Sequence, residues 1–311
     1  MTHNGDAEQV LGMRITRDRT MRTLKLDQQL YIERLLSDFN ATTSKPASTP
    51  SAITSETGAS EGDDNTTATD AERQSYQALV GSLQYATIAT RPDIAQAVNF
   101  LARGLVSPTH RHRAAAWRVL RYLRGTTSLG LTFAGTDGLR TLVGYSDANW
   151  AGLGEENARS ISGWLVKVGS GPVAWSSTQQ RMVGLSVCES EYVAATLATQ
   201  QIIWSRGVLS DCGITLTKST PLFCDCRSAI QLASNQKISQ RTKHINVRYH
   251  FIRERIQDGT IAMNWLRSED QPADALTKPL GPHIFLRLRP TLLGCEDTNE
   301  VQHSQQHSTN I

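Results

Sequence analysis

The sequence predicts an α/β protein in which helices cover a mixed β-sheet. Short strand-like segments come first between residues 142 and 185, separated by turn residues. Helical and strand-like segments then alternate up to residue 294. A run of strands followed by such an alternation indicates a mixed sheet with helices on its faces.

The composition is typical of a soluble globular protein, with 39% hydrophobic and 20% charged residues in a chain of 311. The five cysteines form no framework pattern, which favours a reduced, intracellular protein. The first ten residues lack an apolar signal core, and no apolar stretch is long enough to span a bilayer. We therefore expect neither secretion nor a membrane partner.

The first 70 residues predict two extended segments, a helix and a flexible connection. Residues 10–15 and 21–26 have the pattern of short strands. A helix then runs to Phe39 from Asp27, which suits an N-cap. Residues 41–70 are rich in Thr, Ser, Ala, Gly and Asp and lack the apolar groups needed for a core, which indicates a flexible connection.

Three helices are predicted next, over residues 71–125. The first runs from about residue 71 to residue 89. Pro92 and Pro108 each suit the first turn of a further helix, because a proline there loses no intrahelical hydrogen bond. Gly125 ends the third helix.

The second half carries the sheet. Strands are expected at residues 142–147, 161–168, 172–176, 181–185, 222–226 and 261–266. Helices are expected after Ser186, over residues 228–234 and 244–257, and from about Pro272. The tail from Cys295 is polar, and we expect it to be disordered.

Four acidic residues occupy positions where a carboxylate is costly unless it has a partner. Asp147 ends an apolar strand, Asp225 lies between a strand and a helix, Glu191 lies on an apolar helix face, and Asp274 lies in the first turn of the last helix. Rigid elements fix such side chains in place, and carboxylate oxygens are good ligands for Mg²⁺ or Mn²⁺. We therefore expect a two-metal nuclease site.

Neighbouring acids have simpler explanations. Ser186 and Glu189 match a capping box, whereas Glu191 falls among the sheet-facing alanines of the same helix at about 100° per residue. Asp270 suits an N-cap for the helix that contains Asp274. Each of the four acids, taken singly, could also cap a turn, start a helix or pair with a buried arginine.

Two basic segments suggest a polyanionic partner. Residues 101–125 contain six arginines and no acid, and a second basic run covers residues 237–255. The candidate nucleic-acid contacts are Arg111, Arg118, Arg121, His244 and Arg248. The alternative for both runs is a solvated basic helix face.

The second half of the chain contains a series of distinctive segments, which are, in order, YSDANWAG, RSISGWLV, VAWSSTQQ, SVCESEYVAA, DCRSAIQLA, RTKHINVRYHFIRE and DQPADALTKPL. In this order they closely resemble the ribonuclease H domain of copia-type LTR-retrotransposon Pol polyproteins. Upstream, LGMRI, LDQQLYIERLLSDFN and KPASTP are similar to the end of the reverse transcriptase of those elements. YQALVGSLQYATIATRPDIAQAVNFLAR and AAAWRVLRYLRGT are similar to the connecting segment, so the resemblance covers about residues 9–294.

The resemblance implies a domain order and a fold. A ribonuclease H-like mixed sheet flanked by helices would follow a mostly helical thumb and connection remnant. The implied parts are a reverse-transcriptase remnant (1–48), a flexible linker (49–70), a helical connection (71–136), a ribonuclease H-like domain (137–294) and a disordered tail (295–311).

The resemblance also implies an activity, namely hydrolysis of the RNA strand of an RNA–DNA hybrid. The family's four metal-binding carboxylates correspond to Asp147, Glu191, Asp225 and Asp274. They would hold two Mg²⁺ ions, or Mn²⁺, about 4 Å apart at the scissile phosphate. The missing polymerase part of a Pol protein is a further candidate partner.

The chain departs from the family pattern at several positions. No Tyr-x-Asp-Asp polymerase motif occurs, so we expect no polymerase activity from this chain. Cys226 replaces the usual asparagine after the third acid, and Thr178 and Gln179 replace a usual Lys-Lys pair. Residues 266–273 contain no histidine to help the fourth acid. The alternative function is therefore a catalytically inactive nucleic-acid-binding remnant of a decayed element.

Overall fold

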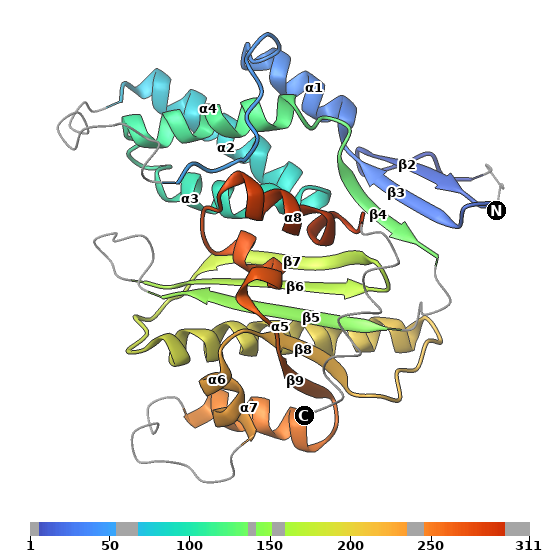
Figure 1. Ribbon diagram of the computed structural model, residues 1–311. Coiled ribbons are helices and arrows are strands. Elements are labelled where there is room, and N and C mark those ends of the chain that lie inside the picture. Colours follow the sequence, from blue (N-terminus) through green and yellow to red (C-terminus); the bar gives the residue numbers. More distant parts are fainter. Residues whose placement is uncertain (1–5, 54–67, 136–140, 151–158, 235–245, 296–311) are drawn as a thin grey trace.

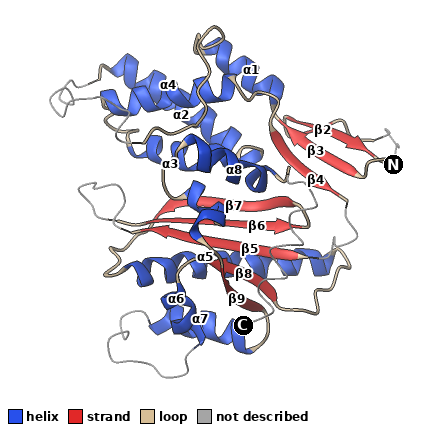
Figure 2. Cartoon of the chain, in the orientation of Figure 1, coloured by secondary structure: helices blue, strands red, loops and turns tan. Residues whose placement is uncertain are grey.

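The computed structural model describes residues 6–53, 68–135, 141–150, 159–234 and 246–295 (Figure 1). Strands and helices come in successive runs along the first part of the chain and alternate after residue 179 (Figure 2). Most of the predicted linker, over residues 54–67, and nearly all of the predicted tail lie outside the described residues. The domain boundaries given above stay a prediction.

A small antiparallel sheet forms beside the helical first half. Its strands, in spatial order, are β1 (Gln9–Val10), β2 (Met13–Asp18), β3 (Thr23–Asp27) and β4 (Gly130–Ala134). The sequence pattern did not predict β4, which lies at the end of the predicted helical connection. Its partner β3 precedes it by about a hundred residues, with Leu26 opposite Leu131, so no local turn signal announces the pairing.

The helices of the first half form where the sequence predicts them. They are α1 (Gln29–Asp38), α2 (Asp70–Ala89), η2 (Pro92–Ile94), α3 (Ala95–Arg103) and α4 (His110–Arg124). Thr69 and Thr109 cap α2 and α4 through their side chains, and Gly125 follows α4 as its C-cap. The N-cap of α1 is Gln28 and not the predicted Asp27, which is the last residue of β3; the Asp27 side chain nevertheless accepts a hydrogen bond from the backbone N–H of Gln29.

The second sheet is mixed and has five strands. They are β5 (Leu142–Asn149), β6 (Ile161–Val168), β7 (Gly171–Gln179), β8 (Thr220–Cys224) and β9 (Ile261–Trp265). The spatial order is β7-β6-β5-β8-β9, with antiparallel pairing from β7 to β5 and parallel pairing from β5 to β9. The predicted α/β class, a mixed sheet flanked by helices, is confirmed. The extended piece predicted at residues 181–185 is not a strand, and these residues bend instead towards the start of the next helix.

Helices cover both faces of this sheet (Figure 1). The helical elements of the second half are α5 (Val187–Asp211), α6 (Arg227–Ser234), α7 (Asn246–Gln257), η4 (Ser268–Asp270), η5 (Pro272–Leu276) and α8 (Pro282–Leu293). On one side α5 packs along β5, β6 and β8, while η5 and α8 lie on the other side. The single helix predicted from Pro272 is thus two elements, a short 3₁₀ turn and then α8.

Two neighbouring residues of β6 show how the core divides. Leu165 points into an apolar cluster shared with α1, α2, α3, α4, η5 and α8, and Val166 points into another shared with α5, α6 and α7. This alternation is the expected period of a strand with both faces covered. Within the described ranges, no helix combines the length and the apolar character needed to cross a membrane.

Candidate metal centre

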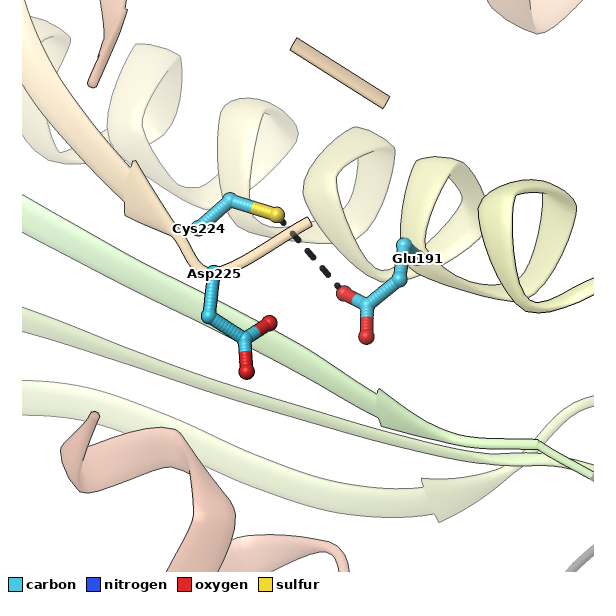
Figure 3. Close-up of side chains that lie close together, drawn as sticks. All are labelled: Glu191, Cys224 and Asp225. Carbon is cyan, nitrogen blue, oxygen red and sulfur yellow. Dashed lines mark hydrogen bonds between the residues drawn. The ribbon is translucent and has the colours of Figure 1, made fainter. Parts of the chain in front are cut away.

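The four predicted acids come together from four different elements. Asp147 lies in β5, Glu191 in α5, Asp225 directly after β8, and Asp274 in η5. Oxygens of Asp147, Asp225 and Asp274 lie within 4.8 Å of one another, and so do ligand atoms of Glu191, Cys224 and Asp225 (Figure 3). Asp225 belongs to both groups, so the acids form one continuous cluster.

A glycine on the neighbouring strand lets the fourth acid approach the first. Gly163 in β6 lies directly opposite Asp147. A Cβ atom at Gly163 would come within 2.6 Å of the Thr277 side chain and 2.9 Å of the Ala273 carbonyl oxygen. The absence of a side chain at Gly163 therefore allows η5, which carries Asp274, to pack directly on the sheet.

A buried glutamine ties the strands of the site to η5. The Gln271 side chain is fully buried and donates hydrogen bonds to the carbonyl oxygens of Ser146, at 3.1 Å, and Phe223, at 3.5 Å. Its own carbonyl oxygen accepts from the backbone N–H of Ala273. One side chain thus links β5, β8 and η5 next to the acids. It also replaces Asp270 as the N-cap of η5, so the prediction for Asp270 was wrong because the helix begins at Pro272.

Three of the four acids of the cluster are deeply buried, and Asp225 is half-buried. Asp147 and Glu191 are each 3% exposed, and Asp274 is 5% exposed. Burial raises the pKa of Asp147, and burial together with the charges of Asp147 and Asp225 raises the pKa of Glu191 well above its usual value. Burial and the charge of Asp147 raise the pKa of Asp274 to about 7. Each of these carboxylates therefore needs a cation or a proton to be stable in place.

One cation is supplied by the chain itself. The Lys278 ammonium group lies 2.9 Å from Oδ2 of Asp274. Burial by itself would lower the pKa of Lys278, but the negative charges of Asp147 and Asp274 outweigh it and raise that pKa. The neighbouring hydroxyl of Thr277 donates a hydrogen bond to Oδ2 of Asp147. Sequence reasoning missed Lys278 and Thr277, although both follow the fourth acid within one helical turn.

The remaining oxygens are suited to hard divalent ions. Oδ1 of Asp274 is buried and has no hydrogen-bond partner in the described part of the chain. One lysine cannot neutralise a cluster of four carboxylates, and all four offer the oxygen ligands that Mg²⁺ prefers. The residues present therefore fit a magnesium centre.

Asp225 is held from the side of β9. The Ser268 hydroxyl donates to Oδ2 of Asp225 at 2.6 Å, and the Trp265 indole donates to its backbone oxygen at 3.1 Å. The guanidinium of Arg227 lies over the exposed Trp265 ring, 4.2 Å from its centroid. Arg227 is exposed, and no acid among the described residues forms an ion pair with its guanidinium.

Several of the predicted nucleic-acid contacts have intramolecular partners. Arg118 donates to the carbonyl oxygen and hydroxyl of Thr49, and Arg121 donates to the carbonyl oxygen of Lys45. The Arg111 guanidinium lies over the Phe100 ring, 5.2 Å from its centroid. Arg118 and Arg121 therefore hold residues 45–49 against α4.

The second basic run is only partly described. His244 lies outside the described residues, and Arg248 is placed by its backbone alone, in α7. Half of the predicted capping box is present, because Ser186 is the N-cap of α5 and its hydroxyl accepts a hydrogen bond from the Glu189 backbone. The Glu189 carboxylate accepts a hydrogen bond from the backbone N–H of Leu185, one residue before the cap.

Comparison with known proteins places the chain among retrotransposon polyproteins. It is 42% identical over 284 residues to the retrovirus-related Pol polyprotein from transposon TNT 1-94 of Nicotiana tabacum, a match that covers 90% of this chain and 21% of that protein. It is 38% identical over 262 residues to the Pol polyprotein from transposon RE1 of Arabidopsis thaliana, covering 84% of this chain and 17% of that protein. The chain thus spans about a fifth of the length of these relatives.

No protein-family model matches the chain. Among solved structures, LC11-RNase H1, isolated from compost, shares 15% identity over 44% of this chain and 93% of that chain, with a TM-score of 0.35. The same enzyme in complex with an RNA/DNA hybrid shares 12% identity over 44% of this chain and 94% of that chain, with a TM-score of 0.34. The identity to the plant polyproteins extends over most of this chain: it is similar to a segment of the retrovirus-related Pol polyproteins of plant transposons, as expected of a copia-type Pol fragment.

Proposed function

We propose that the chain is a magnesium-dependent ribonuclease that hydrolyses the RNA strand of RNA–DNA hybrids. The observation that carries this proposal is the convergence of four carboxylates, from β5, α5, η5 and the end of β8, in a chain similar to Pol polyproteins. Three of them are almost fully buried, and their pKa values are raised. Such a cluster is unfavourable unless cations neutralise it.

The residues proposed to hold the ions are Asp147, Glu191, Asp225 and Asp274. When bound, two divalent ions would supply the Lewis-acid chemistry that activates water and stabilises the leaving 3′ oxygen. Asp147 is only 3% exposed, and the hydroxyl of Thr277 donates a hydrogen bond that fixes the orientation of its carboxylate. Ser268 does the same for Asp225, so these two carboxylates would be positioned before any ion arrives.

Lys278 has a separate role in the proposed reaction. While no ion is bound, its ammonium group neutralises the carboxylate of Asp274. Because the side chain is 37% exposed, it can also move towards a phosphate group that enters from solvent. The chain itself thus contributes one positive charge at the place where a phosphodiester would be cleaved.

Nucleic-acid contact is proposed to involve Arg227 together with the residues predicted from the sequence. Arg227 is exposed, stacks on Trp265 and lies two residues after Asp225. A guanidinium stacked in this way keeps its N–H edge for phosphate oxygens. Arg111, His244 and Arg248 stay proposed contacts, and for Arg118 and Arg121 such a role competes with their hydrogen bonds to residues 45–49.

A second candidate function is hybrid binding without turnover, as expected of a remnant of a decayed element. One observation favours it, because Lys278 already pairs with Asp274 and could take the place of an ion.

We also propose that this chain lacks polymerase activity, since no Tyr-x-Asp-Asp motif occurs, and that the polymerase part of a Pol protein is a partner. Partner and substrate are both inferred from the family.

The direct test uses a hybrid with labelled RNA, incubated with the chain and Mg²⁺. We expect RNA fragments from the hybrid and none from RNA duplex or DNA duplex of the same sequence. Binding of the hybrid without cleavage, with Mg²⁺ and with Mn²⁺ over a range of pH, would support the second candidate. Absence of both binding and cleavage would reject the two candidates together.

A further inference from the structure

A thiol lies within the acidic cluster and was not expected there. Sγ of Cys224 and one oxygen each of Glu191 and Asp225 lie within 4.8 Å of one another (Figure 3). Cys224 is fully buried, at the end of β8, and Glu191 is 3% exposed. The Cys224 thiol is therefore shielded from bulk water, and it faces the Glu191 carboxylate, which could bind the same ion.

The distance between the two buried groups is that of two ligands on one ion. Sγ of Cys224 lies 3.7 Å from Oε2 of Glu191. Tetrahedral zinc, with a sulfur ligand at about 2.3 Å and an oxygen ligand at about 2.1 Å, places these two atoms about 3.6 Å apart. The same distance is compatible with a simple hydrogen bond from the thiol to the carboxylate, which is the alternative to be tested.

The chemistry of the donor set separates this group from the magnesium ligands. Mg²⁺ takes oxygen ligands, whereas a thiolate selects zinc and other soft ions. We propose that Glu191, Cys224 and Asp225 form a site for a thiophilic divalent ion such as Zn²⁺ or Cd²⁺. Three protein ligands leave one tetrahedral position for water, which is an arrangement common for zinc at reactive sites.

The shared ligand gives this site a consequence for the magnesium centre. Asp225 belongs to both groups of ligand atoms, and Glu191 is one of the proposed magnesium ligands. A thiophilic ion bound to Cys224 would also bind the carboxylates of Glu191 and Asp225, so these two ligands would no longer be available to Mg²⁺. Inhibition of hybrid cleavage by zinc rests on the proposed function, but binding of the thiophilic ion does not.

Two other cysteines nearby provide matched controls. Cys188 in α5 and Cys226 at the start of α6 are both half-buried, and Sγ of Cys226 lies 3.1 Å from the hydroxyl of Ser228. Neither belongs to a group of three ligand atoms within the described residues. Replacing either thiol by serine therefore changes the cysteine count without removing a proposed ligand.

The test is a titration of the reduced, metal-free full chain with Cd²⁺, followed by the ultraviolet absorption of the cadmium–thiolate bond. We expect one equivalent of Cd²⁺ to bind the wild type, Cys226→Ser and Cys188→Ser, and the absorption band to be lost in Cys224→Ser. Glu191→Gln keeps the thiol and should weaken binding by about tenfold or more. Circular dichroism of each variant checks that it is folded.

Retention of the band in a folded Cys224→Ser variant would overturn the proposal. Equal loss of the band in Cys226→Ser and Cys188→Ser would also overturn it, because those two thiols would then hold the ion. If Cys224→Ser does not fold, undiminished binding to Glu191→Gln is sufficient to reject the site. Hybrid cleavage with Mg²⁺ alone, measured separately on the wild type, tests the proposed function without reference to cadmium.

Discussion

Asp147 in β5 lies directly opposite Gly163 in β6, and the missing side chain of Gly163 makes room for η5 above Asp147. The backbone oxygen of Ala273 would lie only 2.9 Å from a Cβ atom at this glycine. Backbone of a short 3₁₀ turn cannot move away as easily as the end of a flexible side chain. The position of the fourth acid therefore depends on a residue that makes no contact through a side chain of its own.

Gly163→Ala is expected to displace η5 and to weaken the metal centre. Overpacking of this kind costs about 1–3 kcal/mol of stability. We also expect weaker Mg²⁺ binding, measured by calorimetry, because Asp274 moves away from Asp147. Gly207→Ala in α5 is the control, since a Cβ there meets nothing within 4 Å. Wild-type Mg²⁺ affinity in Gly163→Ala would contradict this role of the glycine.

Lys278→Met is expected to make the metal-free protein less stable and its Mg²⁺ binding tighter. The lysine neutralises Asp274 in the absence of an ion, and the exposure of its side chain limits the loss to about 1 kcal/mol in urea unfolding. With the competing positive charge removed, the affinity for Mg²⁺ should rise several-fold. Lys218→Met removes an exposed lysine instead and should change neither quantity. Weaker Mg²⁺ binding in Lys278→Met would show that the lysine assists the ions.

The stability of the metal-free protein should fall as pH rises. The folded-state pKa of Asp274, about 7, lies above the ordinary aspartate pKa of 3.8, so the folded protein keeps a proton that the unfolded chain has released. The contribution is full below about pH 4 and is lost as pH rises through 7. Asp147 and Glu191 act in the same direction. The free energy of unfolding, measured in urea with a chelator present, should show this decline as pH rises. Added Mg²⁺ should make the decline smaller. The slope should become shallower in Asp274→Asn, and an unchanged slope would contradict the assignment.

Replacing Arg118 is expected to change mainly the stability of the protein, whereas replacing Arg227 is expected to change mainly its binding to the hybrid. Arg118→Ala removes two hydrogen bonds to Thr49 and should lower the free energy of unfolding by about 1–3 kcal/mol. Arg227→Ala should lower it by less than about 1 kcal/mol, because only an exposed stack on Trp265 is lost. It should instead weaken hybrid binding and reduce the slope of log affinity against log salt by about 1. Weaker hybrid binding by a fully stable Arg118→Ala would support the nucleic-acid role predicted from the sequence.

The sequence was most informative where a residue conflicts with its immediate surroundings. Glu191 interrupts an apolar helix face, and Asp147 follows the apolar residues of a strand, so both could be found from local periodicity. The same periodicity predicted nearly every helix and strand. It failed at β4 because the strand with which it pairs, β3, lies far away in the sequence.

The supporting residues could not be found in this way. Gln271 and Lys278 are ordinary polar residues in a loop-rich segment, and their importance comes from contacts with β5, β8 and η5. Arg118 and Arg121 belong to a basic run that is typical of nucleic-acid binding, yet their partners lie about seventy residues earlier in the chain. Only the folded arrangement shows which charges are already used.

The most direct test of the account compares Asp147→Asn with the wild type in cleavage of a labelled RNA–DNA hybrid with Mg²⁺. Asparagine keeps the shape of the side chain and removes the charge of the carboxylate that contacts Thr277. Asp270→Asn changes a nearby exposed acid outside the cluster and serves as the control. We predict cleavage by the wild type and by Asp270→Asn, and only background cleavage by a folded Asp147→Asn. Equal cleavage by all three proteins would contradict the assignment of the four acids as the catalytic metal centre.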